Sequence, residues 1–101
     1  MELQLVEELS GVGIVFLGRH PIGQVHYEIR VYREASRSGV PVVGALEDIR
    51  GRLDGLDFSQ LRDQQVVLRL ADGRAWECAV TSDGRAYDTG RGLTPSYGGQ
   101  M

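Results

Sequence analysis

The sequence predicts a mainly β domain, a small antiparallel barrel or bent sheet of five to six strands with one short helix. Three observations predict it. The length of 101 residues accommodates one compact core. Apolar and polar residues alternate from Gln24 to Tyr32, as they do in a strand with one buried face. Two further alternating runs, 66–70 and 76–80, flank Asp72 and Gly73, a pair that strongly favours a two-residue hairpin turn.

The first part of the chain predicts a hairpin. In the alternating stretch, four apolar residues share one parity and should face the core: Val25, Tyr27, Ile29 and Val31. The preceding segment 11–18, GVGIVFLG, is short and apolar, which indicates a second strand. Pro21 and Gly23 are turn formers, so we expect the two strands to be joined through residues 19–23.

The middle of the chain is harder to interpret. Residues 34–41 have the composition of a loop, and 42–49 predict a third strand with Val43, Ala45 and Ile49 in one phase, followed by a turn. A helical stripe also fits, through Leu46, Ile49, Leu53 and Leu56. We favour the strand because glycines interrupt that stripe, and each costs about 1 kcal/mol relative to alanine inside a helix.

A single helical turn and a last strand complete the expected core. Asp57 or Ser59 can cap a turn that buries Phe58 and Leu61. Asp83 and Gly84 predict a second tight turn, which returns the chain as a short strand over 85–89. We therefore expect one barrel domain over 1–90 and a loose, glycine-rich tail over 91–101.

The place of the helix bears on the type of barrel. OB-like barrels carry a helix between the third and fourth strands, whereas SH3-like barrels have a short helical turn later, so the predicted order favours the OB-like alternative without deciding it. An analogy at the level of the fold implies no function.

Composition excludes several classes of function. All 11 basic residues are arginine, and without lysine there is neither Schiff-base chemistry nor a P-loop. The single cysteine, Cys78, excludes an internal disulfide framework and a multi-cysteine zinc module. The net charge of -3 is unfavourable for binding nucleic acid through its phosphates.

The first residues, MELQLVEELSG, are acidic rather than basic, unlike the start of a secretory signal. No apolar run approaches the length needed to cross a bilayer. We expect a cytoplasmic protein without a membrane partner.

His20, His26 and Glu28 raise the question of a metal site. His26 and Glu28 point to the same side of a strand, about 7 Å apart at about 3.3 Å of rise per residue. A metal needs three or four ligands, however, and His20 lies across the expected turn with no other histidine in the chain. We interpret His26 and Glu28 as part of a solvated strand face and predict neither a metal nor a cofactor.

Three other candidates have similarly ordinary interpretations. Cys78 shares its parity with Trp76 and Val80, which predicts a buried, inert thiol rather than a nucleophile. Gly11, Gly13 and Gly18 lack the spacing and the helical context of a phosphate-binding loop. An acidic cluster, Glu47, Asp48, Asp54 and Asp57, lacks the spacing of a calcium loop and is interleaved with Arg50 and Arg52.

These observations predict a non-catalytic binding module, with a protein partner or a second copy of the chain bound on the outer face of the second strand. The interaction face that we expect consists of His26, Glu28, Arg30 and Tyr32. The alternative is a small nucleic-acid-binding barrel, in which Tyr32, between Arg30 and Arg33, acts together with Arg69 and Arg74. A ligand- or metal-binding accessory domain of an enzyme is a third, weaker alternative.

Overall fold

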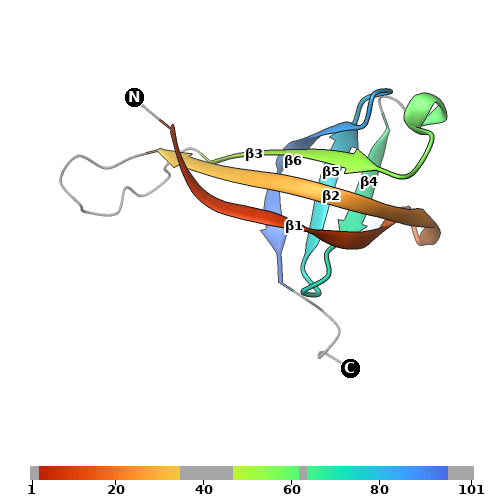
Figure 1. Ribbon diagram of the computed structural model, residues 1–101, viewed down its shortest axis with the longest axis horizontal. Coiled ribbons are helices and arrows are strands. Elements are labelled where there is room, and N and C mark those ends of the chain that lie inside the picture. Colours follow the sequence, from red (N-terminus) through yellow and green to blue (C-terminus); the bar gives the residue numbers. More distant parts are fainter. Residues whose placement is uncertain (1–2, 35–46, 62–63, 96–101) are drawn as a thin grey trace.

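The computed structural model describes residues 3–34, 47–61 and 64–95 of the chain (Figure 1). Six antiparallel strands form a closed barrel in the order β1-β2-β3-β6-β5-β4. The prediction of a small antiparallel barrel is therefore confirmed. The elements are β1 (Leu3–Leu17), β2 (His20–Glu34), β3 (Glu47–Asp54), the 3₁₀ turn η1 (Phe58–Gln60), β4 (Gln65–Arg69), β5 (Ala75–Val80) and β6 (Arg85–Thr94).

Strands β1 and β2 form a hairpin that is much longer than the barrel is tall. They pair from Leu3 opposite Glu34 to Leu17 opposite His20, whereas β1 pairs with β4 over Ile14, Val15 and Phe16. The far half of the hairpin, with the adjoining part of β3, therefore extends beyond the barrel as a three-stranded arm (Figure 1).

The core is apolar and contains the residues that the alternation of apolar and polar residues in the sequence predicts to be buried. All four same-parity residues of β2 are buried, and so are the inward residues of β4 and β5. Trp76 is the largest fully buried side chain. The described residues include no buried polar or charged side chain, so hydrophobic burial is the main stabilising term.

The hairpin over residues 66–80 and the capped turn are confirmed. The connection differs from the expected two-residue turn. Leu70 N–H donates to Arg74 O and Leu70 O accepts from Gly73 N–H, so the loop has three residues, Ala71, Asp72 and Gly73, with Gly73 at φ +91. Asp57 caps η1, because its Oδ1 accepts hydrogen bonds from the backbone N–H and the hydroxyl of Ser59. Phe58 is buried by this turn. Within the described residues, no helix is long and apolar enough to cross a membrane.

Several predicted boundaries are wrong. β1 begins at Leu3 rather than at residue 11, because β2 is long enough to pair with it throughout. The first turn is Gly18-Arg19, where Gly18 has φ +63, and Pro21 lies within β2. β3 begins at Glu47 and continues to Asp54 through Gly51, where a turn was expected; residues 42–46 of the predicted strand lie outside the described residues.

The end of the barrel also differs from the predicted last strand of 85–89. β6 continues to Thr94, because Leu93 packs against the core opposite Trp76. Residues 91–94, expected to belong to the tail, are therefore part of the barrel. Of the rest of the expected tail, the structure describes Pro95 alone.

Candidate functional site

The outer side of β2, β3 and β6 carries a set of charged and aromatic side chains that we call the Arg–Tyr face. It is made by Arg30, Tyr32, Arg50, Arg52, Arg85 and Tyr87. Side chains alternate along a strand, and apolar residues occupy the inward positions of these strands. The six side chains of the face therefore point outward. The face is thus positioned by the same alternation that builds the core.

Strand register places five of these six residues in two rows across the barrel, and Tyr32 lies outside both rows, opposite Asp48. In one row Glu8 lies opposite Arg30, Arg30 opposite Arg50, and Arg50 opposite Tyr87. In the next row Glu28 lies opposite Arg52, and Arg52 opposite Arg85. Each row therefore contains two arginines directly opposite one another, an arrangement that disfavours folding of the sheet.

Acidic side chains at the borders of the face pair with three of its four arginines. The ion pairs are Arg50 with Asp48 at 2.7 Å, Arg85 with Asp83 at 3.4 Å and Arg30 with Glu8 at 3.7 Å. The arginine side chains in these pairs are 60 to 65% exposed, so the pairs contribute little to stability and leave guanidinium N–H groups available. None of the ion pairs among the described residues involves Arg52.

The face is hollowed rather than flat. A shallow hollow of ≈ 350 Å³ is lined by Glu28, Arg30, Tyr32, Arg50, Gly51, Arg52 and Arg85. Four guanidinium groups and one carboxylate line it, and the three carboxylates that pair with these arginines lie at its borders, so the positive groups are concentrated inside the hollow and the negative groups around it. Guanidinium groups bind carboxylates and phosphates through paired N–H donors, and a hollow with this lining suits such a group.

The structure brings three of the four predicted interaction residues, Glu28, Arg30 and Tyr32, to this one hollow. The fourth, His26, lines a neighbouring hollow of ≈ 410 Å³ together with Asp54 and Asp83. The two hollows share Glu28 and Arg52, so they form one continuous surface.

The histidines do not come together. His26 lies opposite Asp54 on β3, and His20 lies at the start of β2, beside the first turn and outside both hollows. Within residues 3–34, 47–61 and 64–95, no group of three or more His, Cys, Asp or Glu side chains is arranged to hold a metal ion.

Cys78 is fully buried in the core. Desolvation, and to a lesser extent the negative charges of Asp88 and Glu77, raise the pKa of its thiol to about 12. The thiolate that a nucleophile requires is therefore disfavoured at neutral pH.

The glycine-rich stretch is strand rather than loop. Gly11 and Gly13 lie in β1, where a Cβ would come within 2.9 Å of Tyr27 Oη and 2.5 Å of Arg69 O, respectively. The space at Gly11 admits the Tyr27 hydroxyl, which accepts a 3.0 Å hydrogen bond from Ala71 N–H. Both glycines serve packing of the barrel.

The acidic cluster is dispersed. Glu47 pairs with Arg33 at 2.7 Å, Asp48 pairs with Arg50, and Asp57 caps η1. Asp54 faces His26 across β2 and β3. Glu47, Asp48 and Asp57 thus each have a local role in the barrel.

Reasoning from the sequence missed Arg85 and Tyr87 as members of the face, and took Arg50 and Arg52 only as local charge compensation. The equal parity of Arg50 and Arg52, and of Arg85 and Tyr87, is visible in the sequence. The pairing of β3 with both β2 and β6 is not, because these strands are distant in sequence. Arg69 and Arg74 do not join the face: Arg69 lies over the Phe16 ring, and Arg74 pairs with Glu7 and Asp72.

Comparison of the chain with protein-family models, with curated proteins and with solved structures finds no match. The function is therefore argued from the site itself.

Proposed function

We propose that this protein is a non-catalytic binding module whose Arg–Tyr face recognises an acidic segment of a partner protein. The observation that carries this proposal is the pairing of like charges across the strands, Arg30 with Arg50 and Arg52 with Arg85. Such pairs oppose folding by several tenths of a kcal/mol each, and the exposed ion pairs of Arg30, Arg50 and Arg85 offset this only weakly. A carboxylate between two guanidinium groups removes their repulsion and gains paired hydrogen bonds.

The aromatic residues of the face support a protein partner. Tyr32 lines the hollow together with the arginines, and Tyr87, which is 42% exposed, lies opposite Arg50 on β6. Tyrosine and arginine are the residue types most enriched where binding energy is concentrated in protein interfaces. Their combination suits an acidic segment that also presents apolar contacts.

The carboxylates around the face favour a protein over a nucleic acid. Glu28, Asp54 and Asp83 lie on or beside it, and they would repel the continuous phosphate backbone of a polyanion. A peptide with a few separated carboxylates can meet the arginines while avoiding these acidic side chains. This patterning is the basis for specificity in the proposal.

The test is a binding titration of the full chain with a fluorescently labelled, glutamate-rich peptide containing one tyrosine. A lysine-rich peptide and a single-stranded oligonucleotide of the same length serve as comparison ligands. We expect the acidic peptide to bind best, and Arg50→Gln with Arg52→Gln to weaken it about tenfold, the factor that corresponds to 1.4 kcal/mol. The matched control is Arg33→Gln, which removes an arginine that pairs with Glu47 away from the hollow.

Tighter binding of the oligonucleotide would replace this proposal with the nucleic-acid alternative, and equal binding of both charged peptides would refute it. A second copy of the chain is the other protein partner considered. Sedimentation of the wild type and of Tyr32→Ala distinguishes this case, because a dimer held through the face would dissociate on loss of the ring.

A further inference from the structure

A third hollow lies across β1, β4, β5 and β6, with a composition different from that of the Arg–Tyr face. Its volume is ≈ 450 Å³, within the size range of small-molecule sites. The floor contains Phe16, Val67 and Ala75, and three arginines surround it: Arg19, Arg69 and Arg91. It therefore combines an apolar base with positive charge, on the outside of the barrel.

Strand register fixes the floor. Phe16 lies opposite Val67 across β1 and β4, and Arg69 lies opposite Ala75 across β4 and β5. Phe16, Val67 and Ala75 are half-buried even though they point away from the core. They form a flat apolar area on rigid strands, a support that holds a ligand more precisely than loops do.

An irregularity in β6 brings Arg91 to this hollow. From Trp76 to Cys78, β5 advances by two residues, whereas the facing stretch of β6 advances by five, from Asp88 to Leu93. The extra residues include Gly90 at φ +106 and Gly92 at φ +68, conformations that favour glycine. A large bulge of this kind re-aims side chains at the surface of a sheet.

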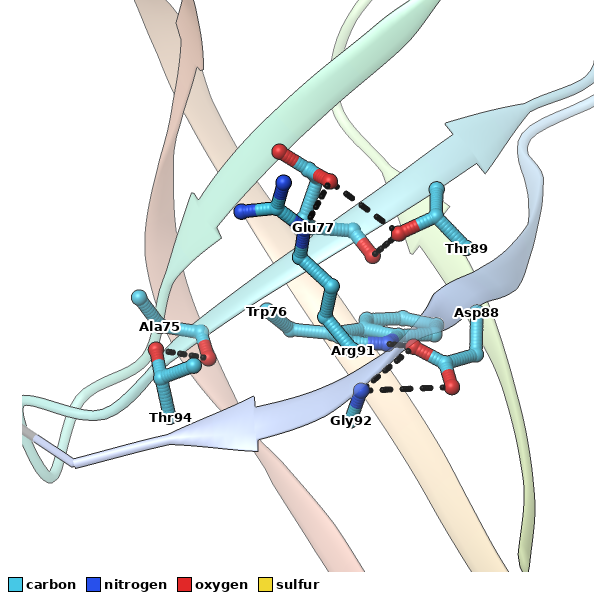
Figure 2. Close-up of polar contacts among 8 residues, drawn as sticks. All are labelled: Ala75, Trp76, Glu77, Asp88, Thr89, Arg91, Gly92 and Thr94. Carbon is cyan, nitrogen blue, oxygen red and sulfur yellow. Dashed lines mark hydrogen bonds and ion pairs between the residues drawn. The ribbon is translucent and has the colours of Figure 1, made fainter.

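Asp88 holds the bulge in place. Its Oδ1 accepts hydrogen bonds from Trp76 Nε1 and from Gly92 N–H, each at 3.1 Å (Figure 2). Arg91, on the loop so fixed, lies 3.5 Å from Glu77 Oε1, measured from its Nε. Core tryptophan, bulge and arginine are thus linked by direct contacts, and the position of Arg91 depends on the fold.

The positive charge of this hollow exceeds what the fold neutralises. Its lining has three arginines and one carboxylate, Glu77, which pairs with Arg91. Arg69 stacks on the Phe16 ring, with Cζ 5.1 Å from the ring centroid, and takes part in none of the ion pairs among the described residues. A guanidinium over an aromatic ring keeps its N–H edge free for an anion.

We propose that this hollow binds a small aromatic carboxylate. The flat ring of the ligand lies on Val67 and Ala75, beside the Phe16 ring that Arg69 covers, and its carboxylate receives hydrogen bonds from Arg69 and Arg91. The size of the hollow, the apolar floor and the charge complementarity each match this class of molecule. The site is independent of the Arg–Tyr face.

The test is a ¹H–¹⁵N NMR titration of the full chain with 2-naphthoate, compared with 2-naphthalenemethanol and 2-naphthylmethylamine, which share the ring but are neutral and cationic. We expect 2-naphthoate to shift the amide signals of Val67, Ala75 and Glu77, and to bind more tightly than the other two. Arg69→Gln with Arg91→Gln should weaken 2-naphthoate about tenfold, as expected for two charged hydrogen bonds. Arg33→Gln, whose arginine lies outside this hollow, should not.

Equal binding of the alcohol and the carboxylate would overturn the proposal, because the arginines would then contribute nothing. Signal shifts confined to other strands, or no shift at millimolar 2-naphthoate, would also overturn it. Retained dispersion of the amide signals in the double variant shows that it is folded. Arg69→Lys with Arg91→Lys, which keeps the charge but loses the paired donors, is expected to bind with intermediate affinity.

Discussion

The backbone of Gly51 in β3 lies directly against the indole ring of Trp76. A Cβ at Gly51 would come within 2.9 Å of Trp76 Cζ3, closer than side-chain carbons approach one another. Gly51 also lines the hollow of the Arg–Tyr face, between Arg50 and Arg52. One residue without a side chain thus lets the largest core residue pack beneath the middle of the candidate site.

Gly51→Ala is expected to destabilise the protein by about 1–3 kcal/mol, the usual cost of overpacking a close-packed core. Urea unfolding followed by far-UV circular dichroism measures it, because this signal is also present in variants that lack the single tryptophan. Trp76→Phe shortens the ring at this contact, so the double variant should lose less stability than the sum of the two single variants. Strict additivity would contradict the contact.

Asp88→Ala is expected to destabilise the barrel by about 1–3 kcal/mol, because Trp76 Nε1 and Gly92 N–H lose their acceptor. Asp88→Asn retains an acceptor oxygen and should cost less. Hydrogen exchange at the Gly92 amide reports the same contact locally. Unchanged exchange in the alanine variant would show that Asp88 does not hold the bulge.

Stability should depend on Asp72 at acidic pH. Hydrogen bonds from the Arg74 side chain and from its backbone N–H lower the pKa of Asp72. The pKa of an aspartate in the unfolded chain is about 4. Because the folded state lowers the pKa of Asp72, this carboxylate adds stability above that pH, and the added stability is lost as the pH falls through the folded pKa.

Asp72→Asn should therefore flatten the fall in unfolding free energy below about pH 4, as measured by urea titrations at several pH values. Arg74→Gln removes the side-chain donor but keeps the backbone N–H, so it should flatten the fall by a smaller amount. Parallel pH profiles for the wild type and both variants would show that this pair does not contribute.

Alkylation of Cys78 should require unfolding. The thiol is fully buried and its pKa is raised to about 12, so iodoacetamide at mildly alkaline pH should react at a rate set by the opening of the barrel. Adding urea should accelerate the reaction in parallel with unfolding. Rapid labelling of the native protein would instead support a reactive thiol and an enzymatic function.

Local patterns predicted the strands whose neighbours are close in sequence. The alternation in β2 and the Asp72-Gly73 turn identify the core residues and the β4–β5 hairpin, because both depend on side-chain parity and turn chemistry alone. The capped turn at Asp57 follows from the same local chemistry.

The wrong strand bounds and the missed site residues arise where contacts with residues distant in sequence determine the structure. Gly51 was taken as the end of a strand, yet Trp76, far along the chain, requires a glycine there. Val6 and Val12 on β1 are exposed, so the first part of this strand lacks a regular alternation of buried apolar and exposed polar residues. That part is a strand because it pairs with β2. Arg85 and Tyr87 join the candidate site only because β6 pairs with β3, which no local pattern encodes.

The central claim, that the Arg–Tyr face binds an acidic protein segment, is tested most directly by photo-crosslinking in the host cell. A photoreactive phenylalanine derivative replaces Tyr32 on the face or, as the control, the exposed Gln65 on β4. We predict protein crosslinks at position 32 that map to an acidic segment and disappear with Arg50→Gln and Arg52→Gln. Crosslinks that survive this double change, or that appear equally at position 65, would contradict the claim.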